Sequence, residues 1–322
     1  MTGPSLAARL GRLRFPLGAP SWPGSVPRPA PERRVGLDFD HEWSRRYPAR
    51  LVRAMILDNV TRPLVRLAAP ATVRGIEHLR YVERPAIFAA NHASHVDTPL
   101  LLTTLPPDIR HRCVVAAASD YFFDRTWKAL LWSFSLAAVP VERGRVNRRS
   151  ADTVAGLLEE GWNLVIFPEG GRSPDGWAQP FRGGAAYLAK RTGRPVVPVH
   201  LAGTRHVLPK KPDGGAPGGS GSESRQGGRL RRSPVTVVFG APLAAAAGED
   251  ARRFGVRIEA AVAALADEAR TDWWSARRRA AAGTTPAQSG PDASPWRRAW
   301  ALGARPGSAA ARPAPDDRWP PR

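Results

Sequence analysis

The sequence predicts an α/β protein with a central, mostly parallel sheet covered by helices, amphipathic N-terminal helices and disordered basic tails. Strand-like and helical patterns alternate over residues 45–275, and several of the expected strands are apolar throughout. Such strands are typical of parallel sheets that are covered on both faces. The 322 residues also include 33 Pro and 30 Gly, too many for one compact fold. We therefore expect disordered segments at 1–44 and 276–322.

Much of the positive charge lies outside the expected strands and helices. The chain has 48 Lys and Arg against 28 Asp and Glu, a formal net charge of +20. Residues 1–34 hold six arginines and residues 275–322 hold nine, while residues 208–234, an expected disordered loop, hold six basic side chains. Segments of this kind bind nucleic acid or anionic membranes, although a general excess of Ala, Arg, Gly and Pro would produce them too.

The motif content makes nucleic acid an unlikely partner and favours an anionic membrane surface. The sequence has no zinc-finger spacing and no aromatic-rich RNA-binding strand, and the lone Cys113 excludes a disulfide scaffold. No run approaches the roughly 20 apolar residues that cross a bilayer. Prolines interrupt the apolar residues near the N-terminus, unlike those of a signal peptide. We expect a peripheral protein at the cytoplasmic face of a membrane, of unspecified oligomeric state.

Two segments are candidates for contact with lipid. Residues 48–68 place apolar side chains at helical spacing with arginines between them, which predicts an amphipathic helix interrupted near Pro63. Residues 127–141 form the longest apolar run, which is too short to span a bilayer. This run fits either a buried core helix or a helix in the membrane interface, and we favour the core helix.

The remaining elements follow from periodicity and from glycine and proline positions. The expected strands are residues 71–79, 85–90, 113–118, 164–167, 195–201 and 235–239. The expected helices follow Asp97, run from Ser150 to Gly161, cover 185–191, and place Phe254, Ile258, Val262 and Leu265 on one face. No internal repeat is evident.

The first candidate site is the segment from Asn91 to Asp97, directly after an apolar strand. The carboxyl ends of strands are where open α/β sheets place their sites. Asp97 can hydrogen-bond one ring nitrogen of His92, which leaves the other nitrogen free to accept a proton. The chain has no Gly-x-Ser-x-Gly nucleophile motif. A His–Asp pair without its own serine can activate a hydroxyl group of the substrate, which indicates direct transfer to an alcohol.

Two other interpretations of this segment stay open at the level of spacing. His92 can be a hydrogen-bonded histidine at the start of a helix, which is the commoner case for such spacing alone. His92, His95 and Asp97 can also be metal ligands, but no second set of ligands accompanies them. We therefore expect neither a metal nor a cofactor.

Two further segments carry anion-binding residue types. Residues 167–173 place Gly170 and Gly171 before Arg172, so backbone N–H groups and a guanidinium can approach an anion, while Glu169 can accept hydrogen bonds from hydroxyls. It is not a phosphate-binding P-loop, because Trp177 stands where that motif has lysine. Residues 139–145 end an expected strand with Arg143 and Arg145, which suit phosphate. Taken alone, each segment also fits an ordinary turn or a solvated loop.

Together these segments resemble the glycerolipid acyltransferases, the PlsC-like lysophosphatidic-acid acyltransferase family. Asn91–Asp97 matches that family's NHxxxxD block, including Ser94, and Phe167–Ser173 matches its FPEGxRS block. Pro140–Arg143 looks like its second block, and Arg194–Thr204 resembles its fourth, with Pro198 as the marker proline. The blocks occur in the family's order within residues 73–243. Residues 45–275 are accordingly expected to form an acyltransferase domain.

The resemblance implies a role for each matching residue. His92 would be the general base and Asp97 would orient it. Pro198 would shape the channel for the acyl chain. The expected substrate-binding residues are Asn91, Ser94, Arg143, Glu169, Gly170, Gly171, Arg172 and Pro198.

The implied reaction moves a fatty acyl group from acyl-CoA or acyl-carrier protein to lysophosphatidate in phospholipid biosynthesis. Glycerol 3-phosphate or another lysophospholipid is the alternative acceptor. A non-catalytic binder of anionic membranes and a His-dependent hydrolase are the alternatives from other classes. Glu142 before Arg143 and His95 inside the first block depart from the family's usual residues, so they leave the acceptor open more than the reaction.

Overall fold

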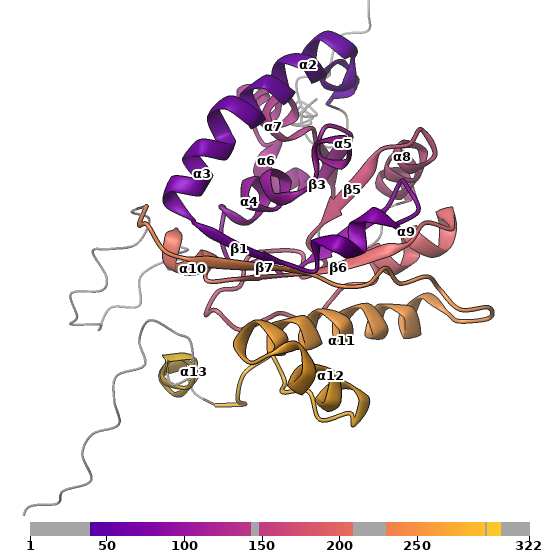
Figure 1. Cartoon of the computed structure of the whole chain (residues 1–322). Coiled ribbons are helices and arrows are strands. Elements are labelled where there is room, and N and C mark those ends of the chain that lie inside the picture. Colours follow the sequence, from indigo (N-terminus) through magenta and orange to yellow (C-terminus); the bar gives the residue numbers. More distant parts are fainter. Residues whose placement is uncertain (1–38, 143–147, 209–229, 294, 304–322) are drawn as a thin grey trace, which may run out of the picture. The chain divides into compact units, whose positions relative to one another are not determined.

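The computed structural model describes residues 39–142, 148–208, 230–293 and 295–303 (Figure 1). The chain divides into a unit of residues Met1–Arg34 and a unit of residues Val35–Arg322, and the described residues belong to the second. Several sequence-based expectations lie outside the described residues. They concern the tail up to residue 38, Arg143 and Arg145, residues 209–229 of the internal loop, and residues 304–322.

Seven strands form one sheet, and all neighbouring strands are parallel except β6 and β7. This confirms the predicted α/β class and the mostly parallel sheet. In spatial order the strands are β1 (Ala71–Arg74), β7 (Val235–Phe239), β6 (Val196–Ala202), β2 (Ile87–Ala90), β5 (Asn163–Ile166), β3 (Cys113–Ala118) and β4 (Ala138–Val141). Every residue of β2 is buried, as its continuous apolar run predicts.

Helices cover both faces of the sheet (Figure 1). Alternate residues of β2 face opposite cores, with Phe88 packed in the core that includes α4 and Ile87 in the core that includes α8, α9 and α11. The helices of the described residues are α2 (Tyr47–Ile56), α3 (Arg62–Ala68), α4 (Asp97–Thr104), α5 (Pro107–Arg110), α6 (Ser119–Phe122), α7 (Thr126–Leu136), α8 (Arg148–Glu159), α9 (Gly184–Thr192), α10 (Thr204–Val207), α11 (Ala251–Arg270), α12 (Trp273–Ala281) and α13 (Pro295–Gly303). Short η segments cover Glu42–Arg45, Leu57–Thr61 and Ile76–Arg80.

The N-terminal helical segment is interrupted as predicted, by a π-helical turn over Leu57–Thr61 immediately before Arg62 and Pro63. Proline lacks the N–H that a regular helix would use there, and the wider turn accommodates its ring. Asp58 in this turn accepts from His111 (2.9 Å) and pairs with Arg110 (2.5 Å). These ion pairs connect the π turn to α5.

Three expected element boundaries were wrong. The strand predicted over 71–79 ends at Arg74, because Gly75 turns the chain with φ of 69° and residues 76–80 form a 3-10 helix. The apolar run 127–141 is a helix followed by strand β4, with Ala137 (φ 48°) as the turn between them. Ser150 lies inside α8, so it does not cap that helix.

The ordered domain extends beyond the expected limits of 45 and 275. Phe39 packs against Phe123 with ring centroids 5.8 Å apart. At the other end, α12 and α13 occupy part of the segment that we expected to be disordered. Asp272 caps α12 by accepting from Ser275 N at 2.9 Å. None of the described helices is long and apolar enough to cross a membrane.

Candidate active site

His92 is the second residue after β2 and is held by the first residue of α4. Its Nδ1 lies 2.8 Å from Oδ2 of Asp97. The Asp97 carboxylate is fully buried, and the same Oδ2 accepts the backbone N–H groups of Ala93 (2.7 Å) and Ser94 (2.8 Å). Backbone N–H groups of the turn between β2 and α4 therefore hold the Asp97 carboxylate, and the carboxylate holds the imidazole ring of His92. This bond leaves Nε2 as the nitrogen that can take a proton from a ligand.

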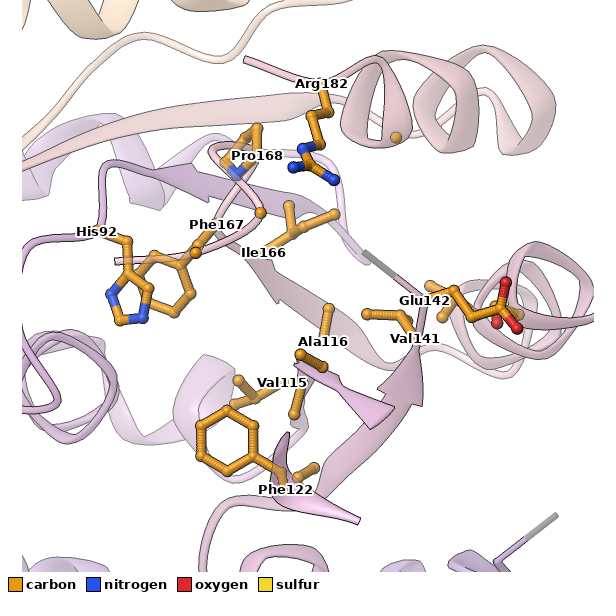
Figure 2. Close-up of a pocket in the computed structure, with 18 of the residues that line it drawn as sticks. His92, Val115, Ala116, Phe122, Val141, Glu142, Ile166, Phe167, Pro168 and Arg182 are labelled. Atoms are coloured by element: carbon orange, nitrogen blue, oxygen red, sulfur yellow. The ribbon is translucent and has the colours of Figure 1, made fainter. Parts of the chain in front are cut away.

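The imidazole of His92 lies flat against Phe167, with ring centroids 4.2 Å apart and an interplanar angle of 22° (Figure 2). Phe167 follows β5, the strand beside β2. The His92 side chain is 14% exposed, so it reaches the surrounding cavity while most of the ring is enclosed. Packing on one side and Asp97 on the other leave the ring little freedom to rotate.

A cavity of about 390 Å³ adjoins His92. Its polar part combines His92 with Gly170, Gly171, Arg172 and Arg182. Its apolar part lies between strands β3, β4 and β5 and helices α8 and α9. The apolar lining includes Val115, Val141, Val154, Ile166, Tyr187 and Leu188. Figure 2 shows His92 and Glu142 at opposite sides of this space, with Arg182 beside the turn that carries Pro168. The cavity thus has cationic groups near the histidine and room for an apolar chain beyond.

Residues 70–202 match the family model described as Acyltransferase. This part of the chain is an acyltransferase-family domain. Over 178 residues the chain is 30% identical to a chloroplastic 1-acyl-sn-glycerol-3-phosphate acyltransferase of Brassica napus, covering 53% of this chain and 44% of that protein. Over 179 residues it is 31% identical to a protein of the same name from Limnanthes alba, covering 54% of each. The chain therefore spans only about half the length of these relatives.

The fold has a counterpart among solved structures. The crystal structure of the 1-acyl-sn-glycerophosphate acyltransferase PlsC from Thermotoga maritima superposes with a TM-score of 0.51. It is 23% identical in sequence, and the match covers 72% of this chain and 84% of that one. This likeness supports the arrangement of sheet and helices described above.

Arg182 is a cavity residue of the acyltransferase domain that sequence reasoning did not select. It lies just before α9, and nothing in its local sequence sets it apart. A Cβ atom on Gly170 would lie 2.6 Å from Nε of Arg182, and Gly170 has a φ of 74°. The left-handed backbone of the turn favours glycine at this position, and the Arg182 side chain packs directly against it.

Glu169 is occupied by the backbone of the domain. Its Oε1 accepts from the N–H of His92 at 2.9 Å, and its Oε2 accepts from the N–H of Gln179 at 3.0 Å. The residue is 5% exposed and is not among the residues that line the cavity. Burial raises the pKa of Glu169 to about 7, although both backbone hydrogen bonds oppose that rise. Its contacts link the turn after β5 to His92.

Three further predicted substrate-binding residues hold the framework together and do not line the cavity. Asn91 exchanges hydrogen bonds with the backbone of Leu201 in β6, at 3.0 and 2.7 Å. Ser94 is fully buried and donates from Oγ to the carbonyl of Leu208 at 2.8 Å. Pro198 lies within β6, where it pairs with Ala89 and accepts from the N–H of Gly240 at 2.8 Å.

His95 lines the same cavity as His92. Burial lowers the pKa of His95 to about 4, helped by the positive charge of Arg172 and by His92. His95 is therefore neutral at physiological pH and adds no positive charge beside His92. The described residues contain no cluster of three or more His, Cys, Asp or Glu side chains that could hold a metal.

A second cavity, of about 400 Å³, also reaches His92. It lies between α2, the π turn, α4 and α7. Its lining is mostly apolar and includes Ile56, Leu57, Pro99, Leu131, Trp132 and Phe134. His92, His95, Thr98, Phe122, Trp132 and Leu136 line both cavities. The histidine thus lies where a space beside the sheet meets a space beside the N-terminal helices.

Proposed function

We propose that this protein transfers a fatty acyl group from an acyl thioester, acyl-CoA or acyl-carrier protein, to the free hydroxyl of lysophosphatidate. The observation that carries the proposal is the His92–Asp97 pair on the wall of a cavity that has arginines at its polar end and an apolar interior. Relatives named 1-acyl-sn-glycerol-3-phosphate acyltransferases support the same acceptor. The proposed reaction uses no metal or cofactor.

In the proposed mechanism His92 acts as a general base. Nε2 accepts the proton of the acceptor hydroxyl while the hydroxyl oxygen attacks the thioester carbonyl carbon. Asp97, bonded to Nδ1, holds the tautomer and stabilises the imidazolium that forms. The tetrahedral intermediate then collapses, the C–S bond breaks, and the thiolate receives the proton from His92. The acyl group moves directly to the alcohol, so no serine or cysteine of the chain forms a covalent intermediate.

The arginines at the polar end of the cavity fit the acceptor's phosphate. Arg172 and Arg182 both line the cavity that contains His92. Guanidinium groups match the geometry of phosphate oxygens through paired hydrogen bonds. A phosphate held there would place the glycerol hydroxyl on the side of His92. Arg143, which lies outside the described residues, stays a prediction for the same role.

We propose that the N-terminal helices and α7 dock on an anionic membrane. Apolar side chains with large exposed fractions occur on all three helices: Leu51, Val52, Met55, Leu64, Leu67, Trp127, Leu130 and Leu131. Arginines between them supply charge for anionic headgroups. The second cavity lies between α2, the π turn, α4 and α7, and His92 is part of its lining. A substrate with an acyl chain can then reach the base from the lipid phase. The outer face of α7 fits the interface interpretation of its sequence better than a fully buried helix.

An acceptor panel tests the proposed reaction directly. The full chain is incubated with labelled acyl-CoA or acyl-carrier protein and with lysophosphatidate, glycerol 3-phosphate or no acceptor. The proposal expects labelled phosphatidate that depends on lysophosphatidate. Product formed only with glycerol 3-phosphate would show that this compound is the acceptor in place of lysophosphatidate. Loss of thioester without any acceptor would indicate hydrolysis. Absence of transfer with both donors would contradict the proposal.

A further inference from the structure

The loop formed by residues 173–179 is bonded to the candidate active site at both ends. Ser173 N donates to the backbone carbonyl of His92 at 2.8 Å. Gln179 N donates to Oε2 of Glu169 at 3.0 Å, and Glu169 in turn accepts from His92 N. Arg172, on the cavity wall, immediately precedes this loop. Any change in the loop's conformation is therefore transmitted to His92 and Arg172.

The middle of the loop is covered by residues 285–303, which we name the C-terminal arm. Residue 294 of the arm is not described, and α13 forms its end (Figure 1). Arg298 Nε lies 2.7 Å from Oδ2 of Asp175, and the Arg298 carbonyl accepts from Nε1 of Trp177 at 3.0 Å. Ala178 N donates to the carbonyl of Gln288 at 3.0 Å. Asp175, Trp177 and Ala178 of the loop are thus bonded to two parts of the arm.

Loop and arm approach each other closely at two glycines. A Cβ atom on Gly176, whose φ is 93°, would lie 2.6 Å from Cδ2 of Leu302. A Cβ atom on Gly290, whose φ is 77°, would lie 2.4 Å from Cδ2 of Trp177. Trp177 is only 4% exposed. Both glycines therefore serve close packing as well as the turns in which they lie.

Arg298 bonds both within the arm and to the loop. Besides its contact with Asp175, it donates from Nη1 to the Pro291 carbonyl at 2.8 Å and from Nη2 to the Ser289 carbonyl at 3.0 Å. These three bonds use donors on all three nitrogens of one guanidinium. One side chain of α13 thus bonds to Ser289 and Pro291 within the arm and attaches the arm to the loop.

We propose that the C-terminal arm is a positioning element of the active site and that Arg298 is its main positioning residue. The arm holds loop 173–179, and the loop holds Arg172 and the backbone of His92 in place for the acceptor. This inference rests on the proposed function for its effect on catalysis. The arm lies outside residues 70–202, so it supplements the acyltransferase-family domain from elsewhere in the chain.

Substitution of Arg298 in the full chain tests the arm. Arg298→Ala should raise KM for lysophosphatidate about fivefold through loss of hydrogen bonds, with a smaller change in kcat. Arg298→Lys keeps a cation near Asp175 and should recover part of the loss. Arg278→Ala, which removes an exposed arginine of α12, is the matched control and should leave KM unchanged. Trp177→Phe keeps an aromatic side chain but removes the Nε1 donor, and should act in the same direction as Arg298→Ala.

Hydrogen exchange supplies a readout that does not depend on acyl transfer. The amides of Ser173 and Gln179 should exchange faster in Arg298→Ala, while amides of β2 and β5 keep their protection. If the wild-type chain transfers no acyl group, the proposed function fails, and the exchange of these two amides still decides the link between arm and loop. The proposal would be overturned if Arg298→Ala and Trp177→Phe both left the exchange of the Ser173 and Gln179 amides and the KM for lysophosphatidate unchanged. Faster exchange throughout β2 and β5 would overturn it too, because Arg298 would then serve general stability.

Discussion

At the scale of single residues, the position of Asp97 explains why His92 has one free nitrogen. One oxygen of Asp97 accepts from the ring and from two backbone N–H groups, all within 2.8 Å. His92 and Asp97 lie five residues apart in one sequence block, so the resemblance of that block to the family selected them together. Arg182 was not selectable in this way, because it approaches Gly170 only when the turns after β5 and before α9 meet in the folded chain.

Asp97→Asn should lower kcat for acyl transfer by about 10²–10⁴-fold, with less effect on KM for the acceptor. An amide can hold the imidazole in the wrong tautomer, and it cannot balance the charge of imidazolium. Steady-state kinetics with lysophosphatidate measure both constants. Asp108→Asn, at an exposed acid of α5, is the control and should retain full activity. A kcat for Asp97→Asn within twofold of wild type would contradict the assigned role.

Glu169 should make the free energy of unfolding depend on pH. Its pKa is raised to about 7 in the folded chain, so between about pH 4.5 and pH 7 the folded state holds a proton that the unfolded state has lost. The stabilisation is complete below pH 4.5 and is lost as the pH rises through 7, by on the order of 3 kcal/mol. Glu169→Gln cannot titrate, and its stability should fall less over this range. Urea unfolding at pH 5 to 8 measures the slopes, and parallel curves would contradict the prediction.

At the scale of elements, continuous apolar runs identified the strands, whereas their ends depended on tertiary contacts. Strand β1 ends at Arg74 because Gly75 turns the chain, and this position requires glycine because a Cβ there would lie 2.0 Å from the carbonyl oxygen of Phe239 in β7. The alternating pattern of residues 71–79 contains no sign of that contact. The helix α13 was missed for the same reason, since its contacts with Trp177 join residues far apart in the sequence.

Gly75→Ala should destabilise the fold more than Gly193→Ala. Both glycines have φ near 68°, where alanine costs about 1–2 kcal/mol. A Cβ on Gly193 meets nothing within 4 Å, whereas one on Gly75 collides with Phe239, which should add about 1–3 kcal/mol. Urea unfolding of the two variants gives the difference. Equal losses of stability would show that the contact between β1 and β7 relaxes without cost.

The exposed apolar faces of the N-terminal helices and α7 should control membrane binding. Leu64→Glu removes an apolar side chain of α3 that is 60% exposed, and should weaken binding to anionic vesicles at least about tenfold. Val256→Glu changes a 62% exposed valine of α11, on another part of the domain, and should leave binding unchanged. Vesicle sedimentation compares the two. Equal binding by both variants would exclude α3 from the docking surface.

At the scale of the whole molecule, the family resemblance and the alternation of strands and helices were sufficient to predict the class of fold. The sheet order could not be predicted, because the chain gives no local sign that β7 runs antiparallel to β6. The extent of the ordered domain was also missed. Proline and glycine content suggested a disordered C-terminal segment, yet Arg279 pairs with Asp267 (2.6 Å) and Arg298 with Asp175 (2.7 Å). Composition alone does not reveal such partners.

Two cavities of the molecule share His92 in their lining. The first cavity, beside the sheet, has arginines in its lining and an apolar interior. The second lies against helices with exposed apolar faces. Under the proposed function, a membrane-bound acyl acceptor and a thioester donor would approach Nε2 of His92 from different sides. The proposed reaction therefore depends on whether Nε2 of His92 takes the proton of the acceptor hydroxyl.

The most direct measurement is acceptor-dependent transfer from labelled acyl thioester to lysophosphatidate, with wild-type protein compared with His92→Ala and with His206→Ala as an exposed control. We expect His92→Ala to lose at least about 10²-fold in transfer rate and to keep its binding to anionic vesicles. His206→Ala should behave as wild type. Transfer by His92→Ala at the wild-type rate would contradict the assignment of His92 as the base.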